Sequence, residues 1–72
     1  MSERLLDLRG LRCPWPALRV GRALRDGREP VLAVADDPLA AREIGAVAAA
    51  RGWTAEAVET AIGRGLRLHP VG

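Results

Sequence analysis

Cys13 is the only cysteine in the chain, and the residues around it are of types that favour a reactive sulfur. Arg9 and Arg12 precede it, and Pro14 and Pro16 follow it. The thiolate is the nucleophilic form of sulfur, and nearby cations or a helix N-terminus stabilise it. Because the chain has no second cysteine for a disulfide, any chemistry of Cys13 must involve sulfur from another molecule.

The two prolines predict where the helix that positions Cys13 begins. The first N–H groups of a helix have no intrahelical partner, so Pro14 and Pro16 in the first turn forfeit no ladder hydrogen bond and pre-set φ. We therefore expect a helix from about Pro14, with Cys13 at or beside its N-cap. Since proline has no N–H, few donors remain near the sulfur. We expect activation to be mainly electrostatic, with no general base nearby.

Further elements are expected on both sides of a buried strand. Residues 4–8 form an apolar-rich run of strand length, and residues 31–35 form an unbroken apolar run typical of a strand covered by helices. Asp36-Asp37-Pro38 then predicts a second helix, with Asp37 as a structural N-cap and Pro38 in the first helical position. Two adjacent carboxylates without a third ligand make a poor metal site, so we expect no metal there.

The last twenty residues leave two alternatives open. Residues 54–62 are good helix formers, yet they also suit a strand paired through a turn at residues 63–65 with a strand over 66–71. Either alternative gives a sheet with helices. A chain of 72 residues forms one domain, here residues 1–72, and helices cover only one face of its sheet well. We expect Trp53 in the core.

Charge is distributed unevenly along the chain. The net charge is +2, but residues 1–28 hold seven arginines and three acidic residues. Arg19, Arg22 and Arg25 form a basic helix face, which suits either docking of an acidic partner protein or RNA, or plain solvation. Trp15 is either an exposed interface anchor or a side chain packed on the first strand. With no lysine, Schiff-base chemistry has no candidate residue.

Residues 6–16, Leu-Asp-Leu-Arg-Gly-Leu-Arg-Cys-Pro-Trp-Pro, resemble the signature of the TusA/SirA-like sulfur-carrier family, whose hallmark is Cys-Pro-x-Pro at the start of the first helix. Val34-Ala35-Asp36-Asp37-Pro38 resembles the family's second landmark, and the resemblance covers essentially the whole chain. It implies a two-layer α/β sandwich of order β-α-β-α-β-β, with a mixed four-stranded sheet and both helices on one face. The last segment is then a hairpin.

The resemblance also implies a function. Cys13 would carry sulfur as a persulfide from a donor, of cysteine desulfurase or rhodanese type, to an acceptor sulfurtransferase, for tRNA thiolation, cofactor assembly or sulfur metabolism. Arg9, Arg12, Pro14 and Pro16 would support the thiolate, and we expect no cofactor, partner enzymes that supply the catalysis, and a monomer in isolation. A small regulatory or RNA-binding module is the alternative. No apolar run of membrane-spanning length or leader is seen, which predicts a cytoplasmic location.

Overall fold

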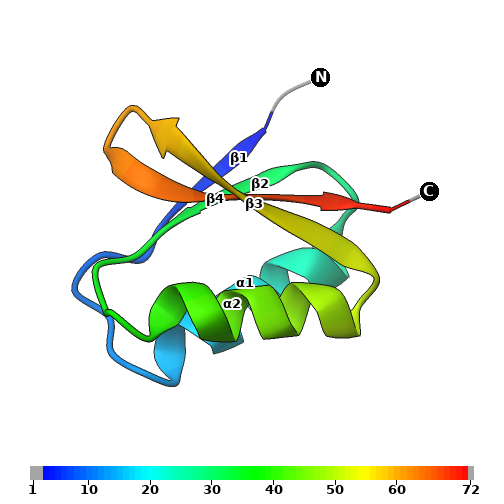
Figure 1. Cartoon of the computed structure of the whole chain (residues 1–72). Coiled ribbons are helices and arrows are strands. Elements are labelled where there is room, and N and C mark those ends of the chain that lie inside the picture. The colour runs from blue at the N-terminus through cyan, green and yellow to red at the C-terminus, as the bar shows by residue number, and fades with distance from the viewer. Residues whose placement is uncertain (1–2, 72) are drawn as a thin grey trace.

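The chain folds into two layers, a sheet and a pair of helices. The structure is a computed structural model and describes residues 3–71. The elements in order are β1 (Arg4–Asp7), α1 (Trp15–Asp26), β2 (Val31–Val34), α2 (Ala40–Ala50), β3 (Trp53–Thr60) and β4 (Gly63–Pro70). Figure 1 shows both helices on the same face of the sheet. The predicted β-α-β-α-β-β sandwich is confirmed.

The sheet is mixed, with the strand order β1-β2-β4-β3. β1 and β2 are parallel, and β4 runs antiparallel to both β2 and β3. Leu6 pairs with Ala33, and Ala33 with Leu66, across the three strands of this register. β2 is central, which explains why its residues are an unbroken apolar run, three of them buried.

The core lies between the sheet and the two helices. Its buried side chains come from both layers: Leu8, Val20, Leu24, Val31, Ala33, Ala40, Ile44, Ala48, Trp53 and Leu68. Trp53 is 7% exposed at the start of β3, so its predicted place in the core is confirmed. Apolar residues at helical spacing along α1 and α2 therefore face the sheet.

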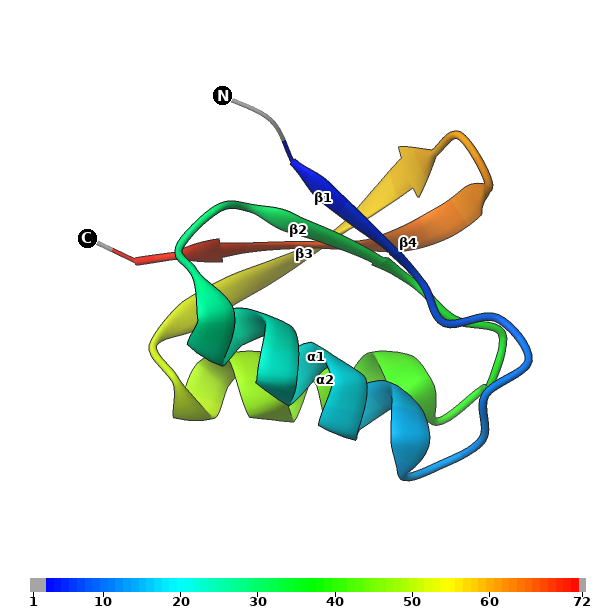
Figure 2. The same cartoon turned by 180° about the vertical axis from the view of Figure 1, so that it is seen from behind.

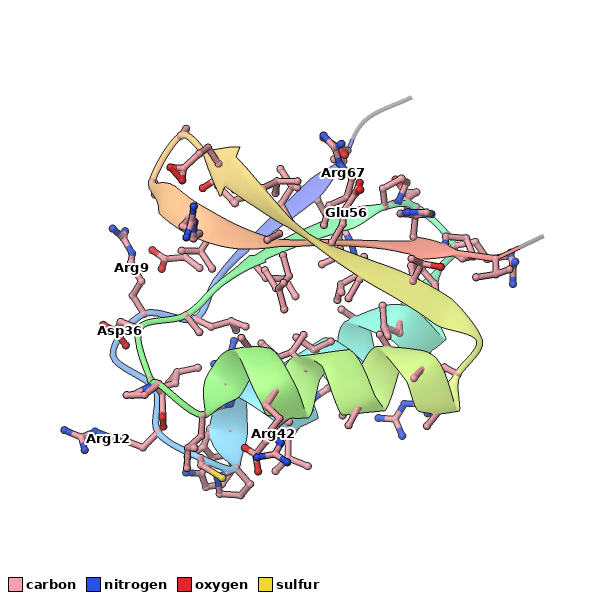
Figure 3. All side chains as sticks on the ribbon, viewed as in Figure 1. Arg9, Arg12, Asp36, Arg42, Glu56 and Arg67 are labelled. Atoms are coloured by element: carbon pink, nitrogen blue, oxygen red, sulfur yellow. The ribbon has the colours of Figure 1, made fainter. Side chains whose placement is uncertain are left out.

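Within residues 3–71, the other face of the sheet has no helix on it and carries charged side chains. Figure 3 shows Arg67 and Glu56 on the side of the sheet away from the helices. The Arg67 Nε donates to Glu3 Oε2 at 2.6 Å, and its Nη1 lies 3.6 Å from Glu56 Oε1. This bridge links the start of the chain to the β3–β4 hairpin.

The hairpin settles the segment that local propensity left open. Residues 54–60 belong to β3, but the turn predicted at residues 63–65 is wrong, because these residues already pair with β3. The turn lies at Ala61 and Ile62, where Thr60 Oγ1 donates to the Gly63 carbonyl and accepts the Ile62 N–H. Among the residues described, neither helix is long and apolar enough to cross a membrane.

Candidate functional site

Cys13 lies in the loop between β1 and α1. Because β1 and β2 are parallel neighbours, both end at the same edge of the sheet, and the loops that follow them meet there. Figure 2 shows the two loops side by side. α1 begins at Trp15 with Pro14 as its N-cap, so Cys13 directly precedes the cap. Its thiol is exposed, and the Cys13–Pro14 peptide bond is cis.

Two aspartates of the β2–α2 loop hold the cysteine loop by its backbone. Both carboxylate oxygens of Asp36 accept the Gly10 N–H, at 3.0 and 3.2 Å. Asp37 Oδ2 accepts the Cys13 N–H at 3.0 Å, while its Oδ1 accepts the Leu39 N–H at 2.9 Å. The hydrogen bonds from the Leu39 and Cys13 N–H groups lower the pKa of the Asp37 carboxyl, and the bond from Leu39 has the larger effect. The Asp-Asp-Pro motif therefore positions the Cys-Pro-x-Pro motif.

The predicted role of Asp37 as the N-cap of the second helix is wrong. α2 begins at Ala40 and Leu39 is its N-cap, which no side chain of the described residues caps by a hydrogen bond. Asp37 and Pro38 instead form a turn before the helix, in which the Ala40 N–H donates to the Asp37 carbonyl. The Asp37 carboxylate bonds an amide two residues on, as in an Asx turn, and has one oxygen left for Cys13.

The prediction that the surroundings favour the Cys13 thiolate is opposed by the carboxylates that the fold brings near Cys13. Hydrogen bonding of the thiol to the Glu43 carboxylate raises the pKa of Cys13. Desolvation of the sulfur and the negative charges of Glu43 and Asp37 raise it further. Each of these effects favours the protonated thiol.

The arginines expected to stabilise the thiolate are engaged elsewhere. Arg9 forms a bidentate ion pair with Asp7, with its Nε and Nη2 each 2.8 Å from a carboxylate oxygen. This pair lowers the pKa of Asp7 to about 2. Arg12 instead helps to lower the pKa of Asp37. Figure 3 shows the Arg9 and Arg12 side chains extending outward from the loop, away from the helices.

Glu43 is the site residue that sequence reasoning missed. It lies in the first turn of α2, and its side chain is half-buried. In sequence it is thirty residues from Cys13, so no local motif joins the two. The usable signal was topological: parallel adjacent strands bring the starts of the two following helices to one edge, and Glu43 is an acidic residue at such a start.

Large apolar side chains are exposed near the sulfur. Trp15 is 59% exposed, so of its two predicted positions the exposed one is correct and the one packed on the first strand is wrong. Leu18, one turn further along α1, and Leu39, beside Asp37, are 56% and 57% exposed. Arg19 and Arg22 are also exposed on α1, whereas Pro16 is fully buried and has a packing role.

Comparisons with known proteins agree with this arrangement. The family model described as Sulfurtransferase TusA matches residues 4–68. The crystal structure of a SirA-like protein from Desulfitobacterium hafniense is similar, with 24% sequence identity and a TM-score of 0.70. The similarity covers 99% of each chain. At this identity the similarity to the crystal structure supports the fold alone. The assignment of the chain to a family rests on the family model.

Proposed function

The chain belongs to the TusA sulfurtransferase family, whose members act in sulfur relay, and on that premise we propose that it carries sulfane sulfur as a persulfide on Cys13. The observation that carries the proposal is the exposed lone thiol of Cys13 at the start of α1, held by its own backbone N–H to Asp37. A carrier needs a sulfur that a partner's sulfur can approach, on a backbone that does not move away. Both requirements are met at this position.

Loading is a transfer between two thiols. The Cys13 thiol loses its proton, and the thiolate attacks the outer sulfur of a donor persulfide. A new S–S bond forms on Cys13 while the S–S bond of the donor breaks, and the donor leaves as a thiolate that takes up a proton. The product is the Cys13 persulfide and a reduced donor, so no external oxidant or reductant is required.

Unloading is the same reaction with an acceptor. An acceptor thiolate attacks the outer sulfur of the Cys13 persulfide, and Cys13 leaves as a thiolate. We propose a cysteine desulfurase or rhodanese-type donor and an acceptor sulfurtransferase, with tRNA thiolation, cofactor assembly or sulfur metabolism as the destination. The partners supply the catalysis. We also propose a cytoplasmic location, because reducing conditions keep a free thiol available.

The surface beside Cys13 supports docking of these partners. Trp15 and Leu18 present apolar area, and exposed tryptophan is a frequent interface anchor. Arg19 and Arg22 add positive charge on the same helix, which suits an acidic patch on the partner. We propose that these residues orient the partner and that Cys13 reacts with it.

The proposal is tested by loading the purified protein from a cysteine desulfurase with cysteine, or from thiosulfate with a rhodanese. Mass spectrometry should find the added mass of one sulfur atom on the peptide that contains Cys13. Cys13→Ser should abolish the adduct and leave the thermal unfolding midpoint unchanged, because the side chain is exposed. An intact, folded wild-type protein that acquires no sulfur from either donor would refute the proposal.

An RNA-binding function is the alternative, and the exposed Arg19 and Arg22 are the observation that favours it. Binding through phosphates weakens steeply as salt rises. Tight, steeply salt-dependent binding of tRNA by the isolated protein, lost in Arg19→Glu/Arg22→Glu, would support this alternative. We expect weak binding instead, since the face has few cations.

A further inference from the structure

The helices leave part of the sheet uncovered near the turn of the β3–β4 hairpin. Trp53, Ala55 and Ala57 are spaced by two along β3 and so face the helix layer, yet in that order they are buried, half-buried and exposed. Figure 1 shows the hairpin twisting away from the start of α2 as it approaches this turn. The space between the hairpin and α2 is a cavity of about 300 Å³, at the lower end of the range for ligand pockets.

The walls of this cavity are apolar, and most of their side chains are short. The aliphatic residues that line it come from the sheet and from α2: Ala33, Ala35, Ala41, Ile44, Ala57 and Leu66. Alanine is a poor strand former, so strand propensity does not account for Ala33 in β2 and Ala57 in β3. A larger side chain at Ala57 or Ala41, both exposed, would fill the space. The cavity is therefore open because small residues line it.

Arg64 is the one charged side chain among the described residues that line the cavity. In β4 it lies two residues before Leu66 and four before the buried Leu68, and so on the same face of the sheet. Its Nε is 4.0 Å from Glu59 Oε2, and the two side chains are 83% and 75% exposed. So exposed an ion pair is weak, and the guanidinium has further donors for a second carboxylate. The cavity thus combines an apolar interior with a single cation.

We infer that this cavity binds a small amphipathic carboxylate, whose aliphatic chain lies among the alanines and whose carboxylate lies beside Arg64. Burial of the chain removes apolar surface of the ligand and of the cavity from water. The carboxylate stays hydrated beside the exposed Arg64, so it loses little solvation. A neutral head group would gain nothing from Arg64, and a cationic one would be repelled by it. The site goes beyond sulfur transfer, since Cys13 is not among the residues that line it.

Fatty acids of increasing length test the apolar part of the site. Butanoate, hexanoate, octanoate and decanoate are added to the full chain below their micelle-forming concentrations, and the methyl NMR signals of alanine and isoleucine are followed. Saturable shifts should appear at Ala33, Ala41 and Ala57. The dissociation constant should fall about fourfold for each methylene that enters the cavity, and it should level off once the chain fills the cavity. Adsorption to exposed residues such as Trp15 would instead keep strengthening with chain length.

The head group of the ligand tests the role of Arg64. Octanoate should bind more tightly than both octan-1-ol and octylammonium. Arg64→Gln should weaken octanoate binding by about two- to fivefold, as expected for an exposed ion pair, and should leave octan-1-ol binding unchanged. Arg22→Gln, an exposed change on α1, is the matched control and should alter the binding of neither ligand.

Larger side chains in the walls test the cavity itself. Ala57→Leu should weaken octanoate binding by more than about tenfold, because the new side chain takes the place of several methylenes of the ligand. Ala41→Leu should do the same from α2, so the test does not depend on one strand substitution. Ala49→Leu is the control, since Ala49 is exposed on α2 and does not line the cavity. Circular dichroism checks that each variant is folded.

Octanoate shifts that are absent or spread over exposed apolar residues would overturn the inference, as would unchanged octanoate binding in Arg64→Gln. Shifts of the cavity methyls with protein concentration alone would make a second copy of the chain the occupant, and would also overturn it. So would shifts caused by a cysteine desulfurase but not by octanoate, which would make a protein side chain the occupant. Cys13→Ser should bind octanoate like the wild type, so this proposal and the sulfur-carrier proposal fail separately.

Discussion

The carboxylate of Asp37 accepts a hydrogen bond from the backbone N–H of Cys13, 24 residues earlier in the chain. This bond joins the two sequence motifs that are characteristic of the chain. It fixes the backbone of the reactive residue and does not involve its sulfur. It also places a negative charge near the thiol, so the group that positions Cys13 also raises its pKa.

Replacing Asp37 should loosen the cysteine loop. Asp37→Ala removes the acceptor for both the Cys13 and the Leu39 N–H, so hydrogen exchange at these two amides should accelerate, and urea should unfold the protein at a lower concentration. Asp36→Ala should accelerate exchange at Gly10 instead. Asp26→Ala, an exposed change on α1, serves as the control. If the Cys13 amide exchanged hydrogen at the same rate in all three variants, the hydrogen bond from the Cys13 N–H to Asp37 would be contradicted.

The reactivity of Cys13 should depend on pH as expected for a thiol of raised pKa. Hydrogen bonding to Glu43 favours the protonated form, so the thiolate of the wild type forms at higher pH than in an ordinary cysteine. Glu43→Gln removes the charge, and the midpoint of the pH–rate profile for alkylation with iodoacetamide should move to lower pH. Alkylation at neutral pH should then be faster. Glu59→Gln provides the comparison, and its profile should coincide with that of the wild type.

Asp7 should titrate far below an ordinary carboxyl group. Its ion pair with Arg9 lowers its pKa from 3.8 to about 2, as carboxyl resonances in an NMR titration would detect. A lowered pKa in the folded state stabilises the fold above pH 3.8, and this contribution disappears as the pH falls through about 2. Arg9→Ala should return the pKa towards 3.8, and Arg25→Ala should not change it.

Gly65 should tolerate no side chain. A Cβ at this position would lie 2.5 Å from the Ala33 carbonyl oxygen and 2.8 Å from Val34 Cγ2, and the carbonyl belongs to the paired strand β2. We expect Gly65→Ala to destabilise the protein by ~1–3 kcal/mol in urea unfolding. Gly45→Ala is the matched control, since no atom of the described residues would lie within 4 Å of an added Cβ and α2 gains helix propensity. It should stabilise by ~0.5–1 kcal/mol.

Much of the fold follows from local features of the chain. The prolines at 14 and 16 predicted the start of α1 to within one residue, and the apolar run at residues 31–35 predicted the central strand β2. Asp37 and Pro38 predicted a helix start, but two residues too early, because a turn precedes α2. Local propensity did not decide between a helix and the hairpin, since the alanines and glutamates of β3 also suit a helix. The prediction of a hairpin came from the family resemblance.

The sequence by itself determined that the single cysteine of the chain precedes a helix that starts with prolines, and that this helix carries a face of arginines. Only the tertiary structure decided the charge that the sulfur experiences. Electrostatic interactions depend on distance in space, and the parallel pairing of β1 and β2 brings Glu43 and Asp37 to the thiol while Asp7 engages Arg9. For this reason a cysteine that is surrounded by arginines in sequence lies among carboxylates in the folded protein.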